Sequence, residues 1–181
     1  HNGFGGFRMQ IGQANNMIRY DHRTAARFTA VTVFLFGIFI ALFLLHLFLY
    51  LYYRTALSNL YFSIFNLSFA ISFYLSFVGR FTTSPQTQLT NSFIGLIIAA
   101  LACFSFSGSA NSLFSKKKLR FRIITALSVL FPILCYLHIG DVGEMLLVLI
   151  CLVLLEAIFL TISAMIRKVK GARIIGFGIL F

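Results

Sequence analysis

The chain has 181 residues, of which 60% are hydrophobic and only 10% are charged, and its mean hydropathy is +0.94. A water-soluble domain carries about 25% charged residues and covers its surface with them. This chain has too few charged residues to cover the surface of a globular domain in water, so an ordinary soluble protein is excluded. The net charge of +11 would suit a nucleic-acid-binding protein, but the positions of the charges indicate another explanation.

Long stretches of the chain contain no charged residue. Three of these stretches follow one another between the residues Arg27, Arg54, Arg80 and Lys116. A transmembrane helix needs about 20 apolar residues to cross a hydrocarbon core of roughly 30 Å, and each stretch is long enough. Transmembrane β-strands would be shorter and would alternate in polarity. These segments are apolar on every side, so we expect helices.

In chain order, residues 1–27 form a polar lead-in, with a strand suggested at 6–11 and a turn toward the membrane at 13–27. Five complete helices and the start of a sixth are then predicted, at residues 28–53, 58–79, 92–113, 123–139, 145–166 and, in part, 174–181. A polar loop at 80–91 and a tight turn at 140–143 separate some of them. Connections this short make successive helices antiparallel neighbours. The predicted fold class is therefore all-α, a polytopic transmembrane helix bundle.

The basic residues predict how this bundle is oriented. Parity places Arg54 and two basic clusters at the same side of the membrane. The clusters are Lys116, Lys117, Lys118, Arg120 and Arg122, and Arg167, Lys168, Lys170 and Arg173. Short cytoplasmic loops carry an excess of Lys and Arg, so this side should be cytoplasmic and residues 1–27 extracytoplasmic. The charge thus indicates a membrane and its anionic head groups as partners, and no nucleic acid.

The fifth predicted helix contains Glu156, the only acidic residue inside a predicted span. A charge at the bilayer centre costs at least ~2.5 kcal/mol, so this side chain should face the bundle interior or be protonated. It could act as a proton- or ligand-coupled switch, or as a neutral acid that joins two helices. Asn66 and Ser105 should lie at similar depth, with His46 nearer the cytoplasm. We predict that Glu156 bonds to one of these three residues.

Other features of the predicted helices indicate packing. The third helix contains three pairs of small residues spaced four apart, which allow close helix approach: Gly95 and Ala99, Ser105 and Ser109, and Gly108 and Ser112. Cys103, Cys135 and Cys151 fall in three different helices, where cysteine usually packs as a small apolar residue.

Motifs for catalysis are missing from the sequence. It has no metal-ligand spacing, no His-Glu-x-x-His, no phosphate-binding loop and no paired carboxylates. Gly176-x-Gly178 lacks the preceding strand that nucleotide binding requires. We therefore predict no catalytic residue, metal or cofactor site, and no enzyme activity within these residues.

Three stretches of sequence carry a resemblance to a known family. They are residues 36–54 (FGIFIALFLLHLFLYLYYR), 58–66 (SNLYFSIFN) and 170–181 (KGARIIGFGILF). The region 28–181 resembles the membrane domain of the bacterial seven-transmembrane receptors with diverse intracellular signalling modules. The first two stretches are similar to the first two helices of that family, and the third to the entry of its sixth helix.

The resemblance implies several further features. An extracytoplasmic β-sandwich that binds carbohydrate-like ligands would precede the first helix, and residues 1–27 would be its tail. A histidine kinase, diguanylate cyclase or phosphatase would follow the seventh helix. The lack of an initiator Met and the end at Phe181 within an apolar run lead us to expect an internal fragment of a seven-helix protein.

Two functions from different classes follow from the sequence. The first is a relay in the bacterial inner membrane that couples an extracytoplasmic sensor to a cytoplasmic output domain, with a homodimer as a candidate assembly. The alternative is a small-molecule or ion transporter that uses Glu156 as a coupling residue. Transporters often carry internal repeats and paired broken helices. Neither is visible here, since Pro132 has no counterpart in the other half of the chain.

Overall fold

The computed structural model describes residues 14–82, 84–114, 119–137 and 142–168, which form five helices and no strand. In chain order these helices are α1 (Ala14–Tyr52), α2 (Leu57–Phe81), α3 (Pro85–Phe114), α4 (Leu119–Tyr136) and α5 (Val142–Ile166). The all-α prediction is therefore confirmed for the described part of the chain. The strand expected at 6–11 and the sixth helix at 174–181 lie outside the described residues.

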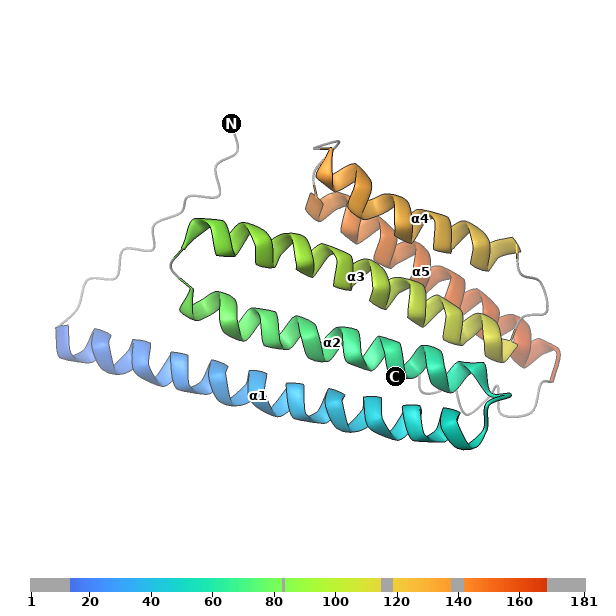
Figure 1. Ribbon diagram of the computed structural model, residues 1–181, viewed down its shortest axis with the longest axis horizontal. Helices are drawn as coiled ribbons and strands as arrows, with labels where there is room; N and C mark the ends of the chain where they lie inside the picture. The colour runs from blue at the N-terminus through green and yellow to red at the C-terminus, as the bar shows by residue number, and fades with distance from the viewer. Residues whose placement is uncertain (1–13, 83, 115–118, 138–141, 169–181) are drawn as a thin grey trace.

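Successive helices run in opposite directions and lie beside one another (Figure 1). α1, α2 and α3 form a row in which α1 packs against α2 and α2 against α3, while α4 and α5 pack against the other side of α3 and against each other. The short connections thus produce the antiparallel neighbours that the sequence predicted. α3 has the central place, because it contacts α2, α4 and α5.

All five described helices begin earlier in the chain than predicted, and the differences are largest for α1 and α3. Residues 13–27 were expected to form a turn, but α1 is helical from Ala14. Residues 80–91 were expected to form a loop, but α3 begins at Pro85. Both extensions are polar and carry good helix formers, and proline is favoured at the first position of a helix. The apolar run marks the part of a helix that can lie in lipid, whereas the helix itself continues past it.

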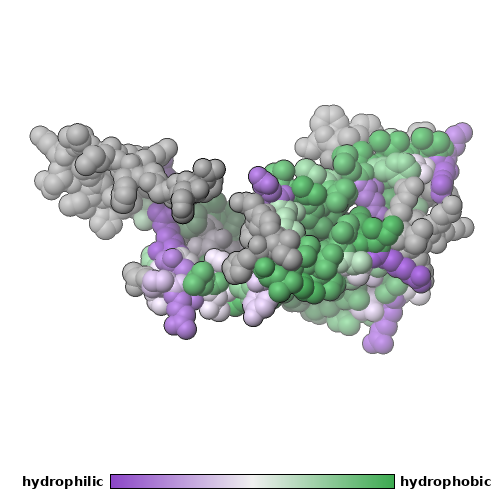
Figure 2. All heavy atoms as spheres, turned by 90° about the horizontal axis from the view of Figure 1, so that it is seen from above, coloured by the Kyte–Doolittle hydropathy of each residue, from purple (hydrophilic) through white to green (hydrophobic). Residues whose placement is uncertain are grey.

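Four of the helices are long and apolar enough to cross a membrane, and they indicate a multi-pass membrane protein. These candidate spans are Ala25–Tyr52, Leu57–Phe81, Pro85–Phe114 and Gly143–Ile166, while the apolar part of α4, Phe121–Tyr136, is shorter. In Figure 2 hydrophobic residues cover most of the described surface that is in view, and hydrophilic residues gather mainly toward the two ends. Phe34 and Leu155, for example, are 68% and 64% exposed.

The interior of the bundle is more polar than its surface. The largest fully buried side chains are serines, including Ser63 and Ser68 on α2 and Ser105 on α3. Their hydroxyls donate to backbone carbonyl oxygens one turn earlier in the same helix, at 2.7–2.8 Å. Small side chains that satisfy their own hydrogen bonds let two membrane helices approach closely. Packing of small groups therefore holds α2 against α3.

Gly108 of α3 lies in close contact with Tyr61 of α2. A Cβ built on it would lie 2.5 Å from Cδ1 of Tyr61, so the tyrosine ring lies directly over the glycine. The same ring contacts Phe104 of α3 and Phe121 of α4 edge-on, each with centroids 5.9 Å apart. Gly95, by contrast, has no atom within 4 Å of such a Cβ. The small-residue prediction thus holds at Gly108 and does not at Gly95.

The buried cysteines pack among apolar residues, as expected. Cys103 of α3 and Cys135 of α4 belong to one core cluster with Ile124, Phe131 and Val153. Both thiols are free, and Cys151 of α5 is free and exposed.

Candidate functional site

Glu156 lies ten residues before the end of α5 at Ile166, about 15 Å along the helix axis. Its carboxylate accepts two hydrogen bonds from α3. Ser107 Oγ donates to Oε2 at 2.8 Å, and Asn111 Nδ2 donates to Oε1 at 3.1 Å. Ser107 and Asn111 are four residues apart and therefore share one face of their helix. We call these three residues the Glu156 cluster.

The two α3 members of the cluster are deeply buried. Ser107 is 1% exposed and Asn111 is 7% exposed, while Glu156 is half-buried. Asn111 Nδ2 also lies 3.1 Å from the backbone oxygen of Ser107 and 3.5 Å from its Oγ. The other end of the amide, Asn111 Oδ1, is buried without a hydrogen-bond partner. Among the described residues, no basic side chain pairs with Glu156.

The predicted partners of Glu156 were wrong at the level of single residues. Asn66 Nδ2 donates to the Phe62 oxygen of its own helix at 2.7 Å, and Ser105 Oγ donates to the Leu101 oxygen. The His46 ring stacks on Phe62, with centroids 5.3 Å apart, and its Nδ1 is buried without a partner. None of the three contacts the carboxylate.

The error has a geometric cause. The prediction estimated depth by counting residues from helix ends, which included the partner helix, α3, among three candidate helices but gave no information about its faces. Ser105 and Ser107 are two residues apart and therefore point about 200° apart around the helix. The signal in the sequence was the pairing of Ser107 with Asn111 at a spacing of four, which places two hydrogen-bonding groups on one face.

The cluster is suited to joining helices and to holding charge. A carboxylate accepts hydrogen bonds when ionised, and when protonated it also donates one; serine and asparagine side chains both donate and accept. The three groups can therefore exchange donor and acceptor roles without moving apart. Such bonds contribute on average about 0.6 kcal/mol each between membrane helices, with larger values in favourable cases.

Glu156 also lines a hollow of about 600 Å³ between α4 and α5. The other residues that line it are apolar: Ile123, Ile124, Leu155, Ile158, Phe159 and Ile162. The carboxylate is thus bonded to α3 on one side and faces this apolar hollow on the other. Pockets that bind small molecules have this composition, with mostly apolar walls and a few fixed polar groups.

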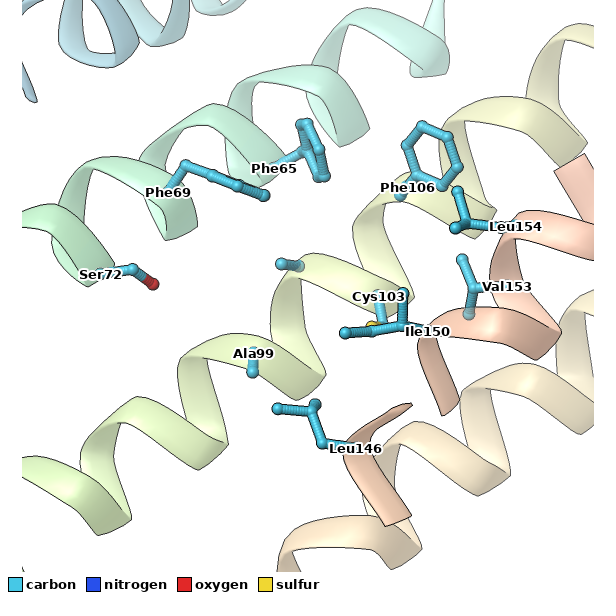
Figure 3. Close-up of a pocket in the computed structure, with 11 residues that line it drawn as sticks. Phe65, Phe69, Ser72, Ala99, Cys103, Phe106, Leu146, Ile150, Val153 and Leu154 are labelled. Atoms are coloured by element: carbon cyan, nitrogen blue, oxygen red, sulfur yellow. The ribbon is translucent and has the colours of Figure 1, made fainter. Parts of the chain in front are cut away.

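Further hollows lie elsewhere in the described part of the bundle, and two of them differ in polarity. The first, about 270 Å³, lies between α2, α3 and α5, and Figure 3 shows Phe65 and Phe69 on one wall with Phe106, Ile150 and Val153 among the others. The second, about 410 Å³, lies where α2 ends and α3 begins. Its walls include Ser76, Gln88, Asn91 and Ser92, which are polar and uncharged.

The described basic residues follow the predicted parity. Arg54, Arg122 and Arg167 lie at the same end of the bundle, where α1 and α5 end and α4 begins (Figure 1). All three are exposed, as is Lys168. The side chains of the other cluster members, Lys116 to Lys118, Arg120, Lys170 and Arg173, lie outside the described part of the structure.

Within the described ranges, no group of three or more His, Cys, Asp or Glu side chains is placed to hold a metal ion. No protein-family model matches the sequence, and no similar protein is found among curated proteins or solved structures.

Proposed function

We propose that this chain is the membrane-spanning relay of a bacterial receptor, which couples an extracytoplasmic sensor to a cytoplasmic output domain. The observation that carries the proposal is the Glu156 cluster, which joins α5 to the central helix α3 by two hydrogen bonds. Because α3 also contacts α2 and α4, a displacement of α5 can be transmitted through α3 to both of these helices. The sequence resemblance to the seven-helix receptors supports the same function.

In this proposal the bundle has two arrangements that differ in how α5 packs on α3. A sensor that favours one arrangement shifts the population and thereby biases the output domain. The polar cluster suits such an element, because its groups can be satisfied by more than one hydrogen-bond pattern. The chain would supply five complete spans, with α4 as the shortest, and the start of a sixth out of seven.

The proposed location is the inner membrane of a bacterium, with residues 1–27 outside and the basic end of the bundle in the cytoplasm. The proposed partners are the lipid bilayer, a carbohydrate-like ligand bound by the sensor, and a second copy of the protein. Nucleic acid is not a proposed partner. We assign no catalysis to this segment, since the output domain would carry it.

The alternative function is transport, and the position of Glu156 beside the 600 Å³ hollow is the observation that favours it. A single acidic residue inside a membrane protein often marks a substrate or proton pathway. A transporter would move a solute across proteoliposomes in a manner that depends on Glu156. A relay would change an output signal without such a flux.

The relay predicts that Glu156→Gln, within the complete reading frame, changes the basal output by several-fold at unchanged membrane abundance. The substitution keeps the shape but removes the charge that both α3 donors bind. Kinase, cyclase or phosphatase output would be measured in membranes. Glu144→Gln at the exposed start of α5 is the matched control and should leave the output as it is. Unchanged output in Glu156→Gln, or gradient-driven solute uptake that this variant abolishes, would contradict the relay.

A further inference from the structure

We propose that the Glu156 cluster is a binding site for a small monovalent cation, with sodium as the representative ion. The inference goes beyond the relay, because it assigns a ligand to the membrane bundle itself. It rests on the oxygen atoms that surround Nδ2 of Asn111, on the buried and unpartnered Oδ1 of the same amide, and on the charge of the site.

Three oxygens surround the nitrogen of the Asn111 amide. Glu156 Oε1 and the backbone oxygen of Ser107 each lie 3.1 Å from Nδ2, and Ser107 Oγ lies at 3.5 Å. The amide hydrogens supply the positive partial charge that these oxygens attract. Carboxylate, carbonyl and hydroxyl oxygens are also the ligands that hard cations take in proteins. Because Nδ2 now lies between these oxygens, a cation can bind to them only after the amide rotates.

The amide of Asn111 can itself become a ligand. Its Oδ1 is buried without a hydrogen-bond partner. The residue as a whole is 7% exposed, and therefore more than nine-tenths buried. Rotation of the amide by about 180° exchanges nitrogen and oxygen, and the two ends have nearly the same shape. Oδ1 would then face the cation together with Glu156 and Ser107. The rotation leaves Nδ2 in the place that Oδ1 now holds without a partner, so the binding of the cation has to offset the hydrogen bonds that Nδ2 gives up.

The net charge of the site selects a monovalent ion. One carboxylate and one monovalent cation make a neutral unit, whereas a divalent ion would leave a net positive charge beside Ile123, Ile124 and Phe159. Isolated charge in apolar surroundings is strongly unfavourable. Transition metals prefer imidazole or thiolate ligands, and none of the three cluster residues supplies one.

The surroundings of the cluster permit this charge balance. The groups that face Glu156 from α3, Ser107 and Asn111, do not titrate, and the α4 residues that line the adjacent hollow are Ile123 and Ile124. The nearest basic residue along α5 is Arg167, eleven positions away or about 16 Å. It is exposed, and charges in water are screened over about 8 Å at physiological salt.

The test compares the thermal unfolding of the complete chain in lipid nanodiscs in sodium chloride and in choline chloride, at equal ionic strength and fixed pH. Sodium at about ten times its dissociation constant should raise Tm by about 3–6 °C in the unmodified chain and in Glu144→Gln. The rise should vanish in Glu156→Gln and in Asn111→Leu. An equal Tm in the two salts would overturn the site, and so would a response to pH alone, which would identify the ligand as a proton.

Asn111→Asp provides a second test, in which the expected result is a new rise of Tm with a different ion. The variant places two carboxylates in the cluster, so a divalent ion would now balance the charge. Calcium chloride should raise its Tm while sodium chloride no longer does, and ²³Na line broadening should fall relative to the unmodified chain. A variant that responds to neither ion, or still to sodium alone, would count against the proposal. These experiments use no output domain, so their failure would leave the relay to be judged separately.

Discussion

Replacing Gly108 by alanine is expected to lower the free energy of unfolding by about 1–3 kcal/mol, the usual cost of overfilling a packed interior. The new Cβ would lie 2.5, 2.6 and 2.9 Å from Cδ1, Cε1 and Cγ of Tyr61. These are ring atoms near the base of the side chain, and the ring is held between Phe104 and Phe121. The bundle can therefore relieve the contact only by separating α2 from α3. Equilibrium unfolding in mixed micelles measures the change.

Gly95→Ala in the same helix is the matched control. Its Cβ would meet no atom within 4 Å, so the stability should stay the same or rise by about 0.4–1 kcal/mol, because alanine restricts the unfolded chain. Removing the ring with Tyr61→Ala should make Gly108→Ala less harmful than it is alone. Equal stability of the two alanine variants would show that Tyr61 does not lie over Gly108.

Asn111→Leu is expected to lower the free energy of unfolding by about 1–2 kcal/mol, the upper part of the range for hydrogen bonds between membrane helices. The change leaves Glu156 with Ser107 as its remaining donor. Adding Glu156→Leu should recover part of this loss, because it removes the carboxylate that lacks a donor, while Ser107 then loses its acceptor. The two substitutions should thus be strongly non-additive in a double-mutant cycle.

Asn66→Leu is the control for this cycle. Asn66 bonds to the Phe62 oxygen of its own helix, so its effect should add to that of Glu156→Leu within about 0.5 kcal/mol. Additive effects of Asn111→Leu and Glu156→Leu would mean that the bond between α3 and α5 does not contribute to stability.

The sequence predicted the elements of this fold better than their ends. The uncharged stretches located all five described helices, because only a helix satisfies the backbone of an apolar segment in lipid. The starts of α1 and α3 were missed by 14 and seven residues, since α1 begins at Ala14 and α3 at Pro85. Helix formation outside the bilayer depends on residue propensity and capping, and the hydropathy of a segment gives no information about either of them.

The candidate site was predicted only in part. Glu156 was identified because an acid among apolar residues must find partners, and α3 was correctly expected among the helices that supply them. The residues Ser107 and Asn111 depend on the rotation of α3 about its axis, which the packing of Gly108 against Tyr61 helps to determine. The sequence of α3 does not predict this rotation, because the buried face of the helix is made of small residues. The hollow beside Glu156 depends on where α4 and α5 separate, so it cannot be predicted from the sequence of either helix alone.

The most direct test of the central claim is the labelling of two single cysteines from opposite sides of the membrane. In a background without Cys103, Cys135 and Cys151, Thr55→Cys lies in the exposed turn between α1 and α2, and Ser84→Cys lies just before α3. In intact spheroplasts, a membrane-impermeant maleimide should label the cysteine at 84, and it should label the one at 55 only after permeabilisation. Labelling of both from the same side, or in the reverse pattern, would contradict a membrane-spanning bundle whose basic end faces the cytoplasm.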